Sequence, residues 1–272
     1  MNGFAFGQYY PADSLLHRLD PRAKLIMALL LVVTSFLCKH VFAFAALLAA
    51  AILLVLLSRI PLRLVLKSIR PVLFIMLFTS VVNIFLTGGE TLLVSWRFIH
   101  IYREGLYKAA FMTVRILVLI VGMSMFMTYT TTPIMLTDAI EQLLSPLKKI
   151  KLPVHEFAMM MTIALRFIPT LVEETNKIMS AQKARGADFT SGSLISRAKA
   201  LIPILIPLFV SAFRRADELA TAMECRCYHG GTGRTRMTVL HYHAMDFVAL
   251  AVIAVFGAGI ILLNRLGIGY TM

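Results

Sequence analysis

The sequence predicts an all-α integral membrane protein with about five transmembrane helices and a cytoplasmic module of bent long helices. Of its 272 residues, 59% are hydrophobic and only 15% are charged, and the mean hydropathy is +0.81. Soluble domains are closer to half apolar and a quarter charged. The apolar residues also gather into runs that approach the roughly 20 residues a helix needs to cross a bilayer. Composition and run length together predict this fold class.

Five apolar runs are long enough, or nearly so, to span the hydrocarbon core. The first is short, but Lys24 and Lys39 can extend it by reaching toward the headgroups. Only Cys38, Lys39 and His40 separate the first two runs, which predicts a tight hairpin between them. The five predicted spans are residues 25–37, 41–57, 72–87, 109–127 and 247–263.

Positive charges orient these spans, because cytoplasmic loops carry more Lys and Arg than external ones. Basic residues precede the first span and fill the loop between the second and third, whereas Lys39 stands alone between the first and second. The loop 88–108 mixes both signs. This pattern predicts a cytoplasmic N-terminus and an external C-terminus. The orienting residues are Arg18, Arg22 and Lys24 before the first span, and Arg59, Arg63, Lys67 and Arg70 in the second loop.

The net charge of +13 does not indicate nucleic-acid binding. Its basic residues are spread between apolar spans and form no stripe interleaved with stacking aromatics; they fit topology signals and contacts with anionic membrane lipid. The three cysteines, Cys38, Cys225 and Cys227, form neither a disulfide framework nor a convincing metal site. We therefore expect reduced thiols and no metal. The first twenty residues lack the apolar stretch of a signal peptide, so no cleaved signal is expected.

Three parts follow from this pattern: N-terminal transmembrane helices (1–129), an interrupted region (130–244) and a C-terminal transmembrane helix (245–272). The middle part begins with a short amphipathic helix that starts after Pro133 and ends near Pro146. Two stretches of about thirty residues follow, apolar first and charged later, and each predicts a helix on the order of 45 Å long. The internal prolines Pro169, Pro203 and Pro207 predict bends in these helices.

Both long helices end in a similar way, in SAQKARGADF (180–189) and AMECRCYHGG (222–231). Either ending alone is an ordinary helix terminus, because arginine in the last turn interacts favourably with the helix dipole and glycine caps the end. Two such endings on long cytoplasmic helices indicate docking instead. Small neighbours let a partner approach closely, and a guanidinium pairs with a carboxylate through two hydrogen bonds. The expected partner surface is an acidic groove.

With these two motifs the chain resembles the transmembrane T component (EcfT/CbiQ-type family) of energy-coupling factor (ECF) ABC transporters. The likeness rests on Ala184-Arg185-Gly186, on Cys225-Arg226-Cys227, and on the order of spans, long helices and final span over nearly the whole chain. It implies that Arg185 docks on one cytoplasmic ATPase and Arg226 on the other member of an EcfA-type pair. The second motif departs from the family's Ala-Arg-Gly pattern, which puts in doubt any backbone conformation that needs glycine at 227.

The resemblance further implies a scaffold and energy-coupling subunit in the cell membrane of a prokaryote. Its partners would be the two ATPases and one or more interchangeable membrane S components, which bind vitamins or other micronutrients, metal ions included. ATP and Mg²⁺ would be bound by the ATPases, so this chain needs no cofactor and has no catalytic residue. Adaptable methionines suit a surface shared by several partners; ordinary packing or lipid contact explains them equally well. The candidate S-component contacts are Met135, Met159, Met160 and Met161.

Other function classes fit the sequence less well. HGGTGRTR (229–236) lacks the Gly-Lys-Ser/Thr ending of a phosphate-binding loop. Glu173-Glu174 resembles the glutamate pair of membrane-embedded prenyl-protein proteases, but Ile178 stands where their motif has arginine.

A secondary transporter usually carries ionisable groups within its spans. Arg115 is the clear candidate for such a group here, and no predicted span has an acidic residue. A conventional ABC permease carries a single Glu-Ala-Ala loop. The last two classes remain the alternatives.

Overall fold

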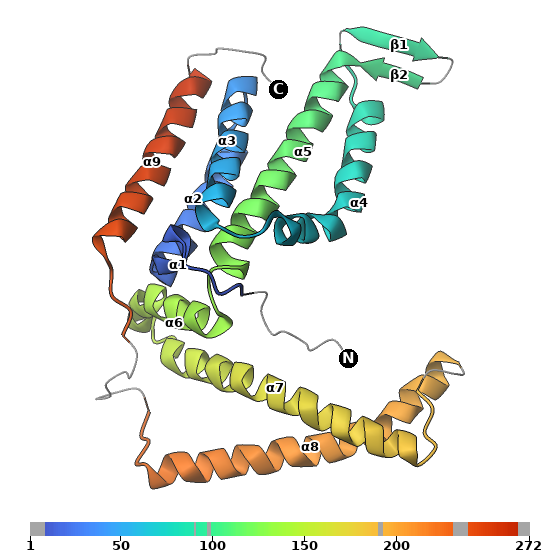
Figure 1. The fold of residues 1–272 in the computed structure, drawn as a ribbon, viewed down its shortest axis with the longest axis vertical. Coiled ribbons are helices and arrows are strands. Elements are labelled where there is room, and N and C mark those ends of the chain that lie inside the picture. The colour runs from blue at the N-terminus through green and yellow to red at the C-terminus, as the bar shows by residue number, and fades with distance from the viewer. Residues whose placement is uncertain (1–8, 90, 97–98, 190–192, 231–238, 266–272) are drawn as a thin grey trace. The chain divides into compact units, whose positions relative to one another are not determined.

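The computed structural model describes residues 9–89, 91–96, 99–189, 193–230 and 239–265 (Figure 1). The chain divides into two compact units, which we describe separately. Unit 1 comprises Met1–Ala139 and Val239–Met272, and unit 2 comprises Ile140–Thr238. Almost all of the described residues with regular structure are helical, which confirms the predicted all-α class.

Unit 1 contains five long helices. Four of them, α2, α3, α5 and α9, form a bundle, and α4 packs against α5 on the side of that bundle. Helix α2 packs on α9 and α5, and α5 packs in turn on α3 and α4. Short elements lie at the ends of the long helices: a one-turn helix, an antiparallel hairpin and a π-helical turn. The elements are α1 (Leu15–Arg18), α2 (Pro21–Leu37), α3 (Val41–Ser58), α4 (Leu62–Leu86), β1 (Leu92–Trp96), β2 (Ile99–Tyr102), α5 (Arg103–Met123), η1 (Ser124–Thr128) and α9 (Ala244–Arg265).

Small side chains bring these helices close together. Ala23, Ala43 and Ala51 are buried in the same core as the large side chains of Leu31 and Leu47. Small residues at helix contacts are the usual way in which membrane helices maximise van der Waals packing, since lipid tails supply no hydrophobic drive. At Gly122, where α5 crosses α2, an added Cβ would overlap the Leu31 side chain. The core therefore depends on alternating small and large residues.

A buried aspartate joins the starts of two helices in unit 1. Asp246, fully buried in the first turn of α9, accepts hydrogen bonds from the backbone N–H of Asp20 and of His243, each at 2.7 Å. Asp20 itself caps α2 by accepting from the backbone N–H of Arg22 at 2.8 Å. Buried Lys24 donates to the carbonyl of Thr130 at 2.9 Å, which adds the segment just after η1 to the same cluster.

The start of α4 differs from the sequence prediction. Helix α4 begins at Leu62, so Arg63, Lys67 and Arg70 lie in the helix rather than in a loop. Pro71 is inside this helix, and in Figure 1 the first turns run in a different direction from the rest. The predicted span 72–87 corresponds to the part after Pro71. Predicting a loop before it was wrong because a proline can bend a helix without ending it.

The segment predicted as a mixed-charge loop, 88–108, also contains regular structure. It holds β1 and β2, paired antiparallel with Ser95 opposite His100, and α5 starts at Arg103, earlier than the predicted span. The strand sequences, LLVSW and IHIY, are rich in residues that favour extended backbone. The predicted hairpin at Cys38–His40 is confirmed, because α2 ends at Leu37 and α3 begins at Val41.

Within the described residues, five helices are long and apolar enough to cross a membrane, but the set differs from the predicted one. They are Val41–Ser58, Leu62–Leu86, Arg103–Thr128, Ile195–Cys225 and Ala244–Arg265. Helix α2, with 17 residues, is near the lower limit for a span and lies within the bundle. The stretch Ile195–Cys225 belongs to unit 2, and its mean hydropathy of 1.6 is the lowest of the five.

Unit 2 is built mainly from two long helices. Helix α7 (Val154–Ala184) has 31 residues and α8 (Leu194–Cys225) has 32, which confirms the two predicted stretches of about thirty residues. They are preceded by η2 (Ser145–Ile150) and by α6 (Pro133–Leu143), within which the boundary between the units falls. The predicted short helix after Pro133 is confirmed by α6.

Candidate functional site

Helices α7 and α8 begin at favourable residues and continue through their prolines. Glu156 places a negative charge in the first turn of α7, where the helix dipole favours it. At the start of α8, the side chain of Ser193 accepts from the backbone N–H of Ser196 at 3.3 Å. Pro203 and Pro207 lie inside α8, and the early turns of this helix bend away from the rest in Figure 1. The bend predicted for α8 is therefore present.

The two helices pack against each other, and one ion pair joins them. A guanidinium nitrogen of Arg215 on α8 lies 3.0 Å from a carboxylate oxygen of Glu174 on α7. A hydrogen bond from Ser211 lowers the pKa of Glu174, and the bond and charge of Arg215 lower it further. Glu174 is therefore ionised at neutral pH and holds the two helices in register.

Apolar side chains continue this contact beside the ion pair. A cavity of about 260 Å³ lies between the helices, lined by Ile163, Phe167 and Leu171 from α7 and by Leu219 and Met223 from α8. Residues early in α7 thus face residues late in α8, so the helices run antiparallel along this contact. As a result, their C-terminal ends point away from the contact in opposite directions (Figure 1).

The end of α7 is closed by a pair of backbone hydrogen bonds. The N–H of Gly186 donates to the carbonyl of Lys183 at 3.0 Å, and the N–H of Ala187 donates to that of Gln182, also at 3.0 Å. Gly186 has φ +88°. This is the Schellman arrangement, in which a left-handed residue just past the helix satisfies two terminal carbonyls. Arg185 occupies the C-cap position before that residue.

The end of α8 repeats the same geometry with different residues. The N–H of Cys227 donates to the carbonyl of Glu224 at 2.9 Å, and the N–H of Tyr228 donates to that of Met223 at 3.0 Å. Cys227 has φ +55°, and Arg226 is the C-cap. The left-handed conformation expected of glycine is therefore present at 227 although the residue is cysteine. Both arginines thus leave their helices from equivalent positions.

All six residues of the two motifs are accessible. Ala184, Arg185 and Gly186 are exposed, as are Cys225, Arg226 and Cys227. Across the described ranges, no ion pair involves either motif arginine, and no cluster of three His, Cys, Asp or Glu side chains could hold a metal ion. The motifs present two unpaired guanidinium groups on capped helix ends, and this arrangement suits recognition of carboxylates.

The ion pair has a regular relation to the motifs that the sequence analysis missed. Glu174 lies eleven positions before Arg185 (174 to 185), and Arg215 lies eleven positions before Arg226 (215 to 226). Each arginine is therefore roughly 16 Å along its helix from the pair. The sequence analysis predicted only that the later part of each long helix is charged. Their equal spacing from the two motifs was the available signal.

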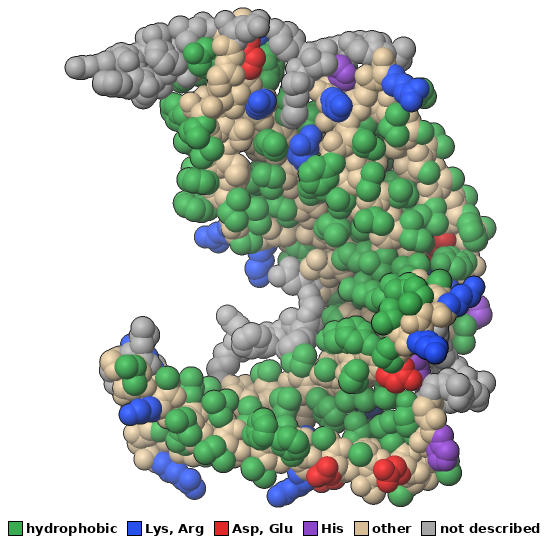
Figure 2. All heavy atoms as spheres, turned by 180° about the vertical axis from the view of Figure 1, so that it is seen from behind, with side chains coloured by type: hydrophobic (Ala, Val, Ile, Leu, Met, Phe, Trp, Pro, Cys, Tyr) green, Lys and Arg blue, Asp and Glu red, His purple; other side chains and the backbone are tan. Residues whose placement is uncertain are grey.

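The four candidate methionines are distributed over both units, and most are accessible. In unit 2, Met160 and Met161 are exposed and Met159 is half-buried; in unit 1, Met135 is exposed. Helix α8 adds a row of exposed large side chains that includes Phe209. Figure 2 shows hydrophobic side chains over much of the visible face of unit 2, with charged ones along an edge. This surface requires lipid or an apolar partner.

The comparison with known proteins decides the family. The family model described as CbiQ, cobalt transport protein, matches residues 12–238, which include both motifs and all of α1 to α8. The chain belongs to the CbiQ family. This confirms the resemblance inferred from the paired arginine motifs.

Relatives of this CbiQ-family chain carry the name energy-coupling factor transporter transmembrane protein EcfT. The protein of that name from Ruminiclostridium cellulolyticum is 53% identical over 95% of this chain and 96% of its own length. The one from Clostridium kluyveri is 52% identical over 89% and 90%, and the one from Bacillus subtilis 49% identical over 93% and 97%. With five candidate spans, this CbiQ-family chain is a multi-pass membrane protein of the transporter class.

Proposed function

We propose that this chain is the scaffold and energy-coupling subunit of an ECF-type ABC transporter. It links two cytoplasmic ATPases of the EcfA type to a membrane S component for uptake of a vitamin or another micronutrient, metal ions included. The chain catalyses nothing in this scheme. ATP and Mg²⁺ are bound by the ATPases, and the S component selects the substrate.

The observation that carries the proposal is the equivalence of the two helix ends. Arg185 and Arg226 follow the same Schellman geometry on two exposed termini. Two equivalent docking groups suit a pair of similar partners. Each guanidinium would enter an acidic groove on one ATPase. The small residues beside each arginine would allow the ATPase surface to approach the backbone of this chain closely.

The contact between α7 and α8 suggests how motion would pass along the chain. The ion pair between Glu174 and Arg215, together with the apolar contact beside it, would make the two helices move as one rigid body. A change in the distance between the ATPases would then turn the helix pair as a body. The S component would contact exposed Met160 and Met161 and half-buried Met159 in unit 2, and exposed Met135 in unit 1.

The proposal places the chain in the cell membrane of a prokaryote with its N-terminus in the cytoplasm. Basic residues support this orientation. Arg18 ends α1 just before α2, Arg22 and Arg63 lie at the starts of α2 and α4, and Arg59 follows the end of α3. These helix ends meet at one end of the bundle (Figure 1). Such an excess of basic residues is typical of the cytoplasmic side.

Co-purification from membranes tests the proposal. The samples are the wild type, Arg185→Glu, Arg226→Glu, the double variant, and Arg197→Glu as a control that reverses an exposed charge in the first turn of α8. We expect the wild type and the control to bring down two nucleotide-binding proteins. In each single variant, the co-purified amount of one or both nucleotide-binding proteins should fall at least tenfold. In the double variant, neither should co-purify.

Uptake of substrate is measured in the same strains. Loss of uptake together with loss of the ATPases supports the proposal. Uptake that persists in every strain, with no nucleotide-binding protein in any sample, would refute it and favour a self-sufficient secondary transporter.

A further inference from the structure

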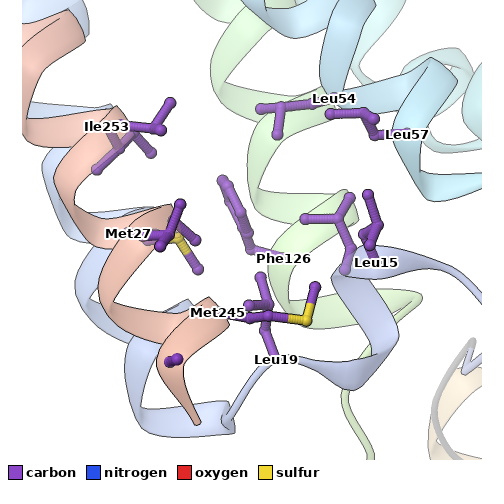
Figure 3. A pocket seen from close by; sticks show the side chains of 13 residues that line it. Leu15, Leu19, Met27, Leu54, Leu57, Phe126, Met245 and Ile253 are labelled. Atoms are coloured by element: carbon purple, nitrogen blue, oxygen red, sulfur yellow. The ribbon is translucent and has the colours of Figure 1, made fainter.

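An apolar cavity of about 410 Å³ lies in unit 1 among α1, α2, α3, η1 and α9. Figure 3 shows Met27, Leu54, Phe126 and Ile253 directed toward this common space from four different elements. Its volume is within the 300–1,000 Å³ range of small-molecule sites. The lining residues are all apolar, so the cavity suits a hydrocarbon ligand.

The cavity is open on the outer surface of the bundle. Val248 and Val252, on the face of α9 that lines it, are 63% and 64% exposed, and Met245 is 46% exposed. Helix α9 is one of the candidate spans. Because a span crosses the hydrocarbon of the bilayer, we expect the exposed valines to face lipid, so that an acyl chain enters from the side.

A polar pocket of about 390 Å³ adjoins the cavity, and the two share Leu15 and Leu57. Arg18 at the end of α1 and Arg59 just past the end of α3 supply two positive charges, and Asp13 supplies a carboxylate. Among the described residues, no ion pair involves Arg18, Arg59 or Asp13. Both guanidinium groups are therefore available to an anion.

We propose that the two pockets together bind one molecule of phosphatidylglycerol. Its phosphate lies between Arg18 and Arg59, and one acyl chain fills the apolar cavity. Charge complementarity selects an anionic phospholipid. Asp13 accepts hydrogen bonds from the glycerol hydroxyls of this headgroup and repels a headgroup with a second negative charge. Together with Arg18 and Arg59 it leaves the pocket one excess positive charge, which phosphatidylglycerol neutralises and a zwitterionic headgroup does not. The site does not depend on the ATPase or S-component partners.

Native mass spectrometry of the full-length protein tests the site. The protein, purified in detergent, is exposed to equal amounts of phosphatidylglycerol, phosphatidylethanolamine and phosphatidylcholine with identical acyl chains. We expect phosphatidylglycerol to be retained at least fivefold over the other two. Replacing both arginines (Arg18→Gln with Arg59→Gln) should remove this preference. The matched control, Arg63→Gln with Arg70→Gln, removes two exposed charges of α4 outside the pocket and should leave it unchanged.

The acyl-chain part of the site is tested separately. Ala249→Phe fills the cavity, whereas Ala251→Phe adds the same volume to the same helix outside it; only the former should reduce lipid retention. Glycerol phosphate alone, at the same concentration, should not raise the melting temperature as phosphatidylglycerol does. The two double arginine variants change only exposed side chains, so they test the proposal even if Ala249→Phe does not fold.

Four outcomes would overturn the proposal. The first two are equal retention of the three lipids, and a loss of lipid preference in the Arg63/Arg70 control variant as large as in the Arg18/Arg59 variant. The third is stabilisation by glycerol phosphate as large as by phosphatidylglycerol. The fourth is that a photo-crosslinking group placed at position 252 crosslinks in membranes to a membrane protein instead of lipid.

Discussion

Gly186 and Cys227 occupy the same place in two matching helix ends, with φ +88° and +55°. A side chain makes the left-handed region unfavourable, because its Cβ approaches a carbonyl oxygen at a cost of roughly 1–2 kcal/mol. Glycine has no such cost. The second motif therefore keeps the geometry of the first with a less suitable residue. At this scale, backbone hydrogen bonds rather than residue type decide the conformation.

This difference predicts opposite effects for two substitutions. Cys227→Gly should stabilise the last turn of α8 by about 1 kcal/mol, and Gly186→Ala should destabilise the last turn of α7 by about the same amount. Hydrogen–deuterium exchange of the terminal amides measures both effects. Changes of the same sign in the two variants would contradict this account.

Asp246 is a second residue whose role depends on its neighbours. Its two carboxylate oxygens accept from different segments, from Asp20 N–H and from His243 N–H. An asparagine offers only one oxygen and presents its amide to a donor. Since hydrogen bonds to charged groups contribute about 1.5–3 kcal/mol each, Asp246→Asn should destabilise unit 1 by about 2–3 kcal/mol. Thermal unfolding in detergent tests this, with exposed Asp217→Asn as the control that should change little.

At the scale of elements, α7 and α8 are coupled by one ion pair and an apolar contact. The pair is only partly buried, with side-chain exposures of 37% for Arg215 and 24% for Glu174. Solvent screens such a pair, so the apolar contact supplies most of the stability. The ion pair instead specifies which turns of the two helices meet. Register, rather than strength, is its contribution.

A charge exchange tests this role. Glu174→Arg and Arg215→Glu should each weaken substrate uptake, because like charges then meet at the helix contact. The double exchange should recover most of the wild-type rate, since the pair is restored in the opposite sense. Substrate uptake by membranes containing each variant is the measurement. If the double variant loses as much uptake as the two single variants combined, the pairing of residues 174 and 215 does not contribute to uptake.

The same pair predicts a limited pH dependence. The pKa of Glu174 is lowered in the folded protein, so its stabilising contribution is complete above the unfolded value of about 4.3. It is lost as the pH falls through the lower folded pKa. The protection factors of amides in the middle of α7, which correct the exchange rates for their intrinsic pH dependence, should therefore be constant from pH 7 to 5 and fall only below about pH 4. Glu174→Gln should remove that acid-dependent step.

At the scale of the whole molecule, alternating helices place the loops on opposite sides of the membrane. In the proposed orientation, the hairpin at Lys39 is external and the ends of α7 and α8 are cytoplasmic. Exposed Cys225 and Cys227 serve as natural labelling sites, and Cys38 is buried, so we expect it not to react. The same alternation puts Arg59 and Lys39 on opposite sides.

An impermeant maleimide tests this topology in intact cells. Lys39→Cys, in a background without the native cysteines, should be labelled from outside, whereas wild-type Cys225 and Cys227 should be labelled only after permeabilisation. Arg59→Cys is the matched site at the other end of α3 and should behave like the native pair. The opposite pattern would reverse the proposed orientation.

The sequence by itself determined the helices and the two arginine-bearing ends. Apolar run length is a local property, and so α3, α7, α8 and α9 appear close to where they were predicted. The family likeness rested on the motifs at Arg185 and Arg226 for the same reason. The boundary of α4 was missed because the local signal at Pro71 fits both a helix end and a bend.

Only the tertiary structure decided which residues meet. The pairing of Glu174 with Arg215, the two hydrogen bonds to Asp246 and the shared boundary of the apolar and polar pockets join segments that are far apart in the chain. Helical periodicity states which residues share a face but not which face another helix covers. That choice depends on the packing of all the helices together, as does the left-handed conformation of Cys227, which two backbone hydrogen bonds maintain against its own preference.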